Sequence, residues 1–333
     1  MSATTGEGRV LVTGVGGAPG LDLARALVRR GLSVIAVDAD PMAPGLHLAG
    51  TVPRTVPLAC HPGFASALLT VCAQERPGFL VSTVEAELGP LLDADLAGVG
   101  VRTWLPSRAT VHACGDKAAF HHVLTVAGVP TPRTWVPEDI DHIPDGVSLV
   151  VKPRHGQGAR HVAYCHTRRQ ARVLCELVPA PIVQERLDGQ EFTADCLVDH
   201  RGTASVILRR RLLVRNGLAM VAETFHDARV EDAVRATLAA VGAEGLGCVQ
   251  GFLTGTGPHP VMVTEMNARI AGAFPVSEAA GADLVGQFLA ALTGADVDHN
   301  RLTYRDGVRL TKYVETLAVT QTPSAPARQG VRA

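Results

Sequence analysis

A short stretch near residue 265 carries three polar side chains that could together handle a metal ion and a phosphate group. Val261–Arg269 has the pattern of a buried strand that runs into the small-residue loop 270–275. Because side chains alternate between the faces of a strand, Glu265, Asn267 and Arg269 are expected to project together. Magnesium prefers hard oxygen ligands, and a guanidinium can hold phosphate or carboxylate through two hydrogen bonds. The pattern indicates half of a metal and phosphate site, although a strand end with a surface ion pair explains the same residues.

The scarcity of lysine marks two further positions. Of the 31 basic residues only three are lysine, namely Lys117, Lys152 and Lys312. Arginine therefore serves almost everywhere that a surface cation is wanted, so a lysine indicates a place that needs a compact point charge. Lys117 begins an expected helix, and Lys152 lies near the end of the apolar strand 148–153.

A glycine-rich loop follows the second lysine. Gly156, Gln157 and Gly158 form it, and glycine lets the main chain approach phosphate oxygens closely. The loop is not of the Walker A type, because the Gly-Lys-Ser/Thr sequence is absent. We expect it to belong to a small α/β unit that can wrap phosphates.

A second glycine turn, Gly14–Gly20, follows the first expected strand, and Asp38 ends the next one. This spacing is similar to the dinucleotide fingerprint of short-chain dehydrogenases. Those enzymes need a Tyr-x-x-x-Lys pair, and none of the three tyrosines here has a lysine four residues later. We favour a tight strand–helix turn that could face a substrate, and NAD(P) binding remains the alternative.

The order of the expected elements predicts an α/β fold with α+β character in the C-terminal part. A β-α-β opening favours a parallel sheet, and the later run of hairpin-connected strands favours an antiparallel one. The expected strands are 9–13, 33–38, 79–82, 148–153, 162–165, 182–185, 191–199, 203–213, 218–224, 248–254, 261–269 and 307–315, and the expected helices are 21–30, 64–75, 88–96, 109–114, 117–127, 168–177, 231–241 and 283–293.

Composition limits the class of protein. The 333 residues are 47% hydrophobic and 19% charged, with a net charge of −1, which gives no reason to expect nucleic acid or a membrane as a partner. The N-terminus has no signal-peptide pattern, so we expect a cytoplasmic protein. Seven scattered cysteines without a Cys-x-x-Cys indicate neither a disulfide framework nor a zinc site. His112, Cys114, His121 and His122 are interpreted as ordinary helix residues.

Taken in order, six motifs resemble the ATP-grasp superfamily, in particular carboxylate–amine ligases similar to one half of the carbamoyl-phosphate synthetase large subunit. Each motif is weak alone, but their order over residues 9–315 is specific. Two of the three lysines fall where this family holds ATP phosphates. The motifs are Asp116-Lys117, Val151-Lys152-Pro153, the loop 156–158, Gln184-Glu185-x-Leu187-x-Gly189-x-Glu191, Gln250, and Glu265-x-Asn267-x-Arg269.

The resemblance implies three domains and a tail. These are an N-terminal Rossmann-like domain with a parallel sheet (1–107), a small mobile lid (108–185) and a C-terminal, mainly antiparallel domain (186–318). The polar segment 319–333 is expected to be a disordered tail.

The resemblance also implies ATP and Mg²⁺ (or Mn²⁺) as cofactors. Lys117 and Lys152 would contact the phosphates, and Gly156, Gln157 and Gly158 would close over them. Glu185, Arg186 and Leu187 would face adenine, and Glu191 the ribose. Gln250, Glu265 and Asn267 would hold the metal, where glutamine in place of an acid lowers the charge and could weaken a second ion. Arg269 would stabilise the phosphoryl group in flight.

Arg211 is a further catalytic candidate. It shares a strand face with Arg209, and related ligases often place an arginine here near the acyl phosphate; a solvated basic edge strand is the competing interpretation. Glu85 and Glu87 could bind an amine or could cap the helix expected near Leu88.

The function implied by the resemblance is ATP-dependent amide formation between a carboxylate and an amine through an acyl phosphate. Phosphoryl transfer needs positioning and charge neutralisation rather than a covalent nucleophile. A carboxylase or carbamoyl-phosphate type of reaction, a dinucleotide-dependent oxidoreductase and a non-catalytic nucleotide-binding subunit are the alternatives. We expect small-molecule carboxylate and amine substrates, leave their identity open, and leave a homodimer open as the assembly.

Overall fold

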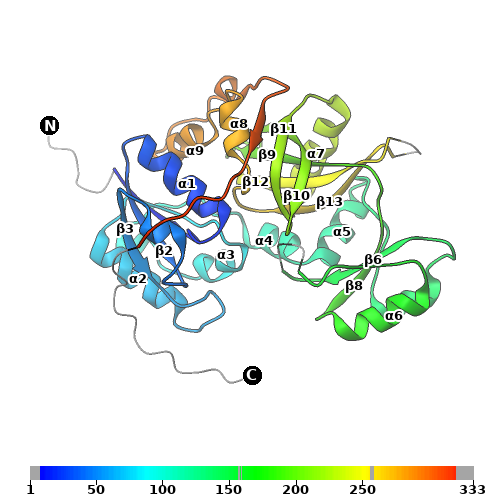
Figure 1. Ribbon diagram of the computed structural model, residues 1–333. Coiled ribbons are helices and arrows are strands. Elements are labelled where there is room, and N and C mark those ends of the chain that lie inside the picture. Colours follow the sequence, from blue (N-terminus) through cyan, green and yellow to red (C-terminus); the bar gives the residue numbers. More distant parts are fainter. Residues whose placement is uncertain (1–7, 157, 159, 256–258, 320–333) are drawn as a thin grey trace. The chain divides into compact units, whose positions relative to one another are not determined.

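The computed structural model describes residues 8–156, 158, 160–255 and 259–319, so Gln157 and the segment 320–333 lie outside the described residues. The described chain divides into two compact units. One contains residues 8–83, 94–103 and 313–319, and the other contains 84–93 and 104–312 (Figure 1). The division at residues 107 and 185 that the resemblance implies stays a prediction.

The first unit is built on a parallel sheet in the strand order β3-β2-β1-β4. Its strands β1 (Arg9–Thr13), β2 (Ser33–Asp38) and β4 (Phe79–Val81) are apolar along nearly their whole length, as expected of parallel strands that are covered on both faces. The edge strand β3 (Thr51–Thr55) was not predicted, because its alternating sequence contains a proline. The helices are α1 (Ala18–Arg29) and α2 (Phe64–Glu75), with short turns of 3₁₀ helix at Pro44–His47 and Ala97–Val99.

The glycine turn after β1 is a tightly packed structural element. Gly14 has φ +69°, and a Cβ on Gly20 would lie 2.3 Å from the Gly14 carbonyl oxygen, so α1 starts directly on the turn. Asp38 accepts hydrogen bonds from the main-chain N–H groups of Gly16 (2.7 Å) and Asp40 (3.0 Å), one on each carboxylate oxygen. The helix therefore begins at Ala18 and not, as the sequence pattern predicts, at Leu21.

A small antiparallel sheet in the second unit has the order β5-β8-β6-β7. Its strands are β5 (Thr134–Trp135), β8 (Pro181–Glu185), β6 (Leu149–Pro153) and β7 (Ala163–Cys165). Helix α6 (Arg168–Leu177) packs its buried face, centred on Ala171, against Val151 and Val183. This confirms the small α/β unit around the glycine loop.

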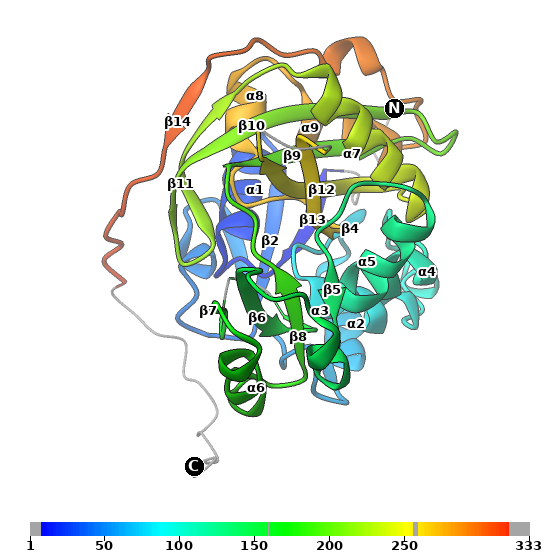
Figure 2. The ribbon, with the colours of Figure 1, turned by 90° about the vertical axis from the view of Figure 1, so that its right-hand side faces the viewer.

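The larger sheet of this unit is antiparallel, with the order β13-β12-β9-β10-β11-β14. The strands are β9 (Gln190–Val198), β10 (Ala204–Arg215), β11 (Leu218–Thr224), β12 (Gly245–Leu253), β13 (Val261–Asn267) and β14 (Arg309–Thr311). One face is apolar and packs against α5 (Lys117–Val126) and α7 (Ala228–Ala240), which Figure 2 shows beside it. Phe192, Ala194, Leu208 and Val249 belong to this core.

The opposite face of the same sheet is polar. Because side chains alternate, β9 directs Phe192 and Ala194 into the core and Glu191, Thr193 and Asp195 to the other face. The short helix α8 (Pro275–Ala279) lies on that face, where Ser277 Oγ donates to Asp195 Oδ2 over 2.6 Å. The candidate site residues of β10, β12 and β13 lie on this polar face.

Three further elements differ clearly from the sequence predictions. Strand β13 ends at Asn267, so Arg269 lies beyond it, and its pairing with β12 is irregular between Gln250 and Gly251. Helix α3 is Glu85–Leu92, because it begins with acidic residues that suit a helix N-terminus, and ends before Leu96. The last strand, β14, is far shorter than the predicted strand 307–315. Helix α8 was not predicted.

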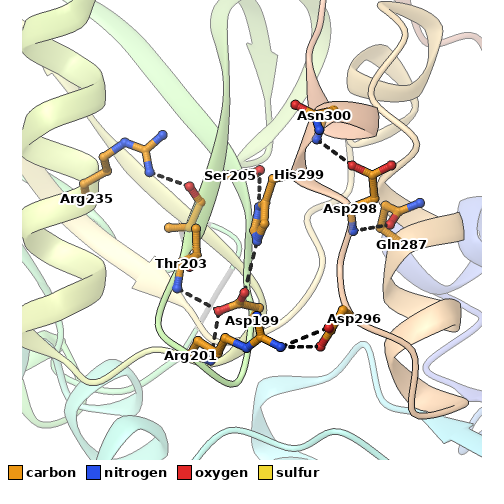
Figure 3. Close-up of polar contacts among 11 residues, drawn as sticks. Asp199, Arg201, Thr203, Ser205, Arg235, Gln287, Asp296, Asp298, His299 and Asn300 are labelled. Atoms are coloured by element: carbon orange, nitrogen blue, oxygen red, sulfur yellow. Dashed lines mark hydrogen bonds and ion pairs between the residues drawn. The ribbon is translucent and has the colours of Figure 1, made fainter.

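Polar contacts join the turn between β9 and β10 to the segment that follows α9 (Leu284–Leu292) (Figure 3). Asp199 accepts the N–H groups of Arg201 (2.9 Å) and Thr203 (2.7 Å), and its Oδ2 lies 3.3 Å from His299 Nε2. His299 Nδ1 is 2.7 Å from Ser205 Oγ. Burial raises the pKa of Asp199, but these hydrogen bonds outweigh it and lower that pKa. The contact among Ser205, His299 and Asp199 is therefore structural, because Asp199 already accepts the main-chain N–H groups of the turn.

Candidate functional site

Lys117 and the glycine loop are joined directly. Lys117 is the first residue of α5, its Nζ donates to the Gly156 carbonyl oxygen over 2.8 Å, and its N–H donates to Arg154 O over 3.0 Å. Gly156 (φ +116°) and Gly158 (φ +74°) adopt conformations that side chains disfavour. The start of α5 and the loop after β6 thus meet at one place, as the predicted phosphate site requires.

An aspartate–arginine pair holds this junction. Asp116 caps α5 by accepting the N–H groups of Ala118 and Ala119, and both of its oxygens also accept hydrogen bonds from Arg154 at 2.7 Å. Burial raises the pKa of Asp116, but the hydrogen bonds from Arg154 and the main chain have the larger effect, so the pKa is lowered overall. Arg154 was missed in the sequence because its partner lies 38 residues away.

Lys152, on β6, lies near both Lys117 and Glu265. Burial lowers the pKa of Lys152 to about 8, a shift that Glu265 opposes and Lys117 reinforces. The two lysines of the predicted phosphate site and the acid of the predicted metal site therefore share one electrostatic environment, although they come from α5, β6 and β13.

A buried histidine lies behind the two lysines. His121 Nε2 is 2.6 Å from the side-chain nitrogen of Gln184, which can only donate, so the ring accepts there and is neutral. Its Nδ1 contacts Thr131 Oγ1, which donates to Val263 O over 2.9 Å. Burial, with Lys152 and Lys117, lowers the pKa of His121 to about 3. His121 thus links α5, β8 and β13, a role that was not predicted from the sequence.

The three predicted metal ligands lie together at the β12–β13 pair. Gln250 is the register partner of Glu265, and Asn267 follows on the same strand. Gln250 Oε1 accepts from Arg211 Nη1 over 3.0 Å, and Asn267 Oδ1 accepts from Arg269 Nη2 over 2.9 Å. Each amide oxygen has a second lone pair, so one carboxylate and two carbonyl-type oxygens can still be offered to a hard cation.

This donor set fits magnesium better than a transition metal. In the described part of the chain no group of three or more His, Cys, Asp or Glu residues could hold a metal ion. A cation bound by Gln250, Glu265 and Asn267 would therefore take its other ligands from phosphate oxygens and water, as Mg²⁺ commonly does.

Arg211 is placed beside the metal ligands. Its Nη1 is 2.9 Å from Glu191 Oε2 and donates to Gln250, while Nη2 donates to Gly217 O over 2.6 Å. Burial lowers the pKa of Arg211, whereas Glu191 and Glu265 raise it. The structure thus pairs Glu191, the predicted ribose contact, with Arg211, the predicted catalytic arginine.

Arg269 lies just beyond β13 and is held by main-chain and side-chain oxygens. Nη1 donates to Ile270 O and Nη2 to Asn267 Oδ1, both over 2.9 Å. Its Nε is 3.8 Å from Glu85 Oε2, and Glu85 Oε1 accepts the Ala268 N–H over 3.3 Å. Glu85 comes from α3, which the sequence could not place here.

The segment that leaves the small sheet carries the predicted adenine contacts. Glu185 Oε2 accepts from Arg133 Nε over 2.9 Å, and Arg186 lies over the Tyr164 ring at 5.0 Å. Leu187 follows on the way to β9 and is half-buried. Arg133 was missed in the sequence, again because its partner is distant along the chain.

Comparisons with known proteins bear on the family and the fold. Residues 178–316 match a family model described as "ATP-grasp in the biosynthetic pathway with Ter operon". The carbamoyl phosphate synthase large chain of Thermus thermophilus is 26% identical over 264 residues, which cover 72% of this chain and 25% of that protein. The chain therefore spans about a quarter of the length of this curated relative.

Solved structures share the fold. Biotin carboxylase of Campylobacter jejuni has a TM-score of 0.70 and 15% identity, covering 87% of this chain and 72% of that one. N5-carboxyaminoimidazole synthetase of Staphylococcus aureus with ADP has a TM-score of 0.70 and 15% identity, covering 90% and 80%.

Together, the sheets, the lysine pair and these matches define an ATP-grasp fold. Residues 178–316 are similar to an ATP-grasp family model, and the sequence is similar to part of the carbamoyl phosphate synthase large chain. No helix within the described residues is long and apolar enough to cross a membrane.

Proposed function

We propose that the protein is an ATP-dependent carboxylate–amine ligase that forms an amide through an acyl phosphate and releases ADP and phosphate. The observation that carries the proposal is the grouping of Lys117, Lys152, Glu265 and Arg269 around one polar sheet edge. The chain has only three lysines. Two of them lie close to an acid that can bind a metal and to an arginine, and this grouping supports a polyphosphate site.

In this proposal the two lysines neutralise the ATP phosphates, and the loop Gly156–Gly158 covers them with main-chain N–H groups. Glu185, Arg186 and Leu187 face adenine, and Glu191 reaches the ribose. Glu191 then exchanges part of its contact with Arg211 for hydroxyl groups, which its partial exposure permits.

Gln250, Glu265 and Asn267 would hold Mg²⁺ or Mn²⁺, which when bound supplies charge neutralisation at the phosphate oxygens. Arg211 donates to the amide oxygen of Gln250, and Arg269 donates to that of Asn267. Their guanidinium groups are thus oriented by the same oxygens that would bind the cation.

The chemistry asks these residues for positioning and for charge. The substrate carboxylate attacks the γ-phosphorus of ATP, the bond to the bridging oxygen breaks and ADP leaves, while the lysines and arginines offset negative charge on the transferring oxygens. The amine then attacks the acyl carbon and phosphate leaves. Exclusion of water protects the acyl phosphate from hydrolysis during the second step.

A second candidate function is phosphorylation of bicarbonate or carbamate, as the names of the biotin carboxylase and carbamoyl phosphate synthase relatives suggest. The same residues serve it, because bicarbonate is also a carboxylate-type acceptor. Dinucleotide binding is less well supported, because none of the three tyrosines has the lysine four residues later that the short-chain dehydrogenases need.

The test is release of ADP and phosphate from MgATP across pools of amino acids, other carboxylic acids and bicarbonate, with products read by mass spectrometry. The ligase proposal expects ADP release that depends on carboxylate and amine, with an amide product. ADP release that needs bicarbonate alone would favour the second candidate. Hydride transfer with NAD(P) and no ATP turnover would refute both.

Glu265→Gln should lower turnover by about 1,000-fold or more, because the site loses its one predicted carboxylate ligand. The matched control is Glu231→Gln on α7, where the acid forms only an i,i+4 pair with Arg235 at the surface. The control should keep full turnover; full turnover in Glu265→Gln would remove the metal assignment.

A further inference from the structure

Glu85 joins α3 to the end of β13. It is the first residue of α3, yet its carboxylate reaches the two residues that follow the predicted metal ligand Asn267. One oxygen, Oε1, accepts the Ala268 N–H over 3.3 Å, and the other, Oε2, lies 3.8 Å from Arg269 Nε. The contact spans 183 positions in the sequence.

The Arg269 guanidinium is oriented from three sides. Its two terminal nitrogens donate to Ile270 O and Asn267 Oδ1, and the Nε edge faces Glu85. The side chains of Arg269 and Glu85 are only 11% and 12% exposed. A carboxylate buried next to a buried guanidinium restricts where that guanidinium can move, because separating the two would leave an uncompensated charge.

We propose that Glu85 is a positioning residue, which holds Arg269 against Asn267 so that the guanidinium stays beside the metal and phosphate ligands. The proposal rests on the proposed function, in which Arg269 acts on the phosphoryl group. It assigns α3 a part in the chemistry, although α3 lies far from the ATP-grasp motifs in sequence.

The alternative role of Glu85, binding the incoming amine, fits the structure less well. Its oxygen Oε2 is buried and accepts no hydrogen bond from a described residue, so an amine would find no open approach to it. Burial also raises the pKa of Glu85, while Arg269 and the Ala268 N–H oppose that rise.

The test separates the two half-reactions. Acyl phosphate formed from MgATP and a pool of the twenty common amino acids is trapped by hydroxylamine as hydroxamate, and amide is measured separately without hydroxylamine. Glu85→Gln keeps the size of the side chain and removes its charge. It should lower kcat for both products by the same factor, about 10- to 100-fold, with the KM for ATP unchanged.

A double-mutant cycle tests the coupling to Arg269. In an Arg269→Lys background, Glu85→Gln should lower the rate by less than about 3-fold, because the group it positions is already altered. Glu85→Asp should recover part of the loss, and the control Asp93→Asn, an exposed acid at the end of α3, should change nothing. Multiplicative losses in the double variant would overturn the proposal, as would loss of amide with hydroxamate intact.

Crystal structures of the wild-type protein and Glu85→Gln decide the same point without turnover. The positioning role expects Arg269 to leave Asn267 Oδ1 in the variant while the fold is kept. An unchanged Arg269 would overturn it, whatever the activity. Absence of hydroxamate from the wild type would count against the proposed function with amino acids as substrates, and these structures would still test Glu85.

Discussion

Arg209 and Arg211 lie two positions apart on the same face of β10, and the structure uses them differently. Arg209 forms two hydrogen bonds to Asp195, at 3.0 and 3.1 Å, and both side chains are almost completely buried at 3% and 2% exposure. Arg211 touches Glu191, Gln250 and Gly217 instead, and Glu191 is 35% exposed. One arginine is enclosed, and the other borders the solvent.

The difference separates a structural ion pair from a candidate binding group. Asp195 also accepts the Ser277 hydroxyl, so the Arg209 pair is saturated and locks β9, β10 and α8 together. The guanidinium of Arg211 contacts Gln250, a predicted metal ligand, and Glu191, a partly exposed acid. These partners can be exchanged when a ligand binds. Residue type and strand face are the same; only the partners across the sheet differ.

The largest expected effect is on stability. Arg209→Met should lower the free energy of unfolding by about 3–5 kcal/mol, because the buried Asp195 carboxylate loses its counter-charge. Urea unfolding followed by circular dichroism measures it. The matched control is Arg210→Met, whose guanidinium lies over the Phe225 ring at 4.2 Å and should matter by only about 1 kcal/mol. Equal effects of the two substitutions would break the comparison.

The next effect is on activity. Arg211→Met should lower kcat by about 100-fold, or about 2.7 kcal/mol of activation free energy, while the free energy of unfolding changes by less than about 1 kcal/mol. The loss of stability is smaller than for Arg209→Met because the Glu191 side chain is 35% exposed, although its Oε2 atom is buried, whereas Asp195 is enclosed entirely. Steady-state ADP release measures kcat, with Arg215→Met at the end of the same strand as control. A stability loss as large as that of Arg209→Met would place Arg211 in the scaffold as well.

The smallest expected effect is a change in the free energy of unfolding with pH, and it comes from His121, the buried histidine behind the lysines. The pKa of His121 is lowered to about 3 in the folded protein, from 6.5, so the unfolded chain takes up the proton first as the pH falls. Stability is therefore complete above about pH 6.5 and should fall by about 2 kcal/mol between pH 7 and pH 5. Urea midpoints across this window measure it.

The two neighbouring histidines provide the control for that measurement. His121→Gln should remove most of the pH dependence between pH 7 and pH 5, whereas His122→Gln should retain it, because His122 is exposed on the same helix. If the free energy of unfolding of His121→Gln still fell with pH as steeply as that of the wild type, another group would be the one that takes up the proton.

Local patterns in the sequence predicted much of this molecule. The strands 9–13 and 33–38 and the helices 64–75 and 168–177 have the predicted ends, because apolar periodicity and glycine or proline boundaries act over a few residues. The grouping of Lys117, Lys152 and Glu265 was also predicted, since the order of the motifs carried it. Their individual roles toward ATP and metal remain proposals.

The partners that hold these residues could not be predicted. Arg154, Arg133, His121 and Glu85 each act through a contact with a residue distant along the chain, and no local pattern marks it. The ending of β13 at Asn267 was missed for a related reason. Alternation predicts that Arg269 shares a face with Asn267, and it does meet Asn267, but through a turn and not along a strand.

The shortage of lysine has a practical consequence for chemical labelling. Amine-directed reagents find only three side-chain targets, and two of them are the residues around the glycine loop and β13. With a pKa of about 8, Lys152 holds more of the reactive neutral amine at pH 7.5 than an ordinary lysine does. Acylation of lysine in this protein therefore reports mainly on the candidate site, and a tryptic map made with and without MgATP tests whether a nucleotide protects it.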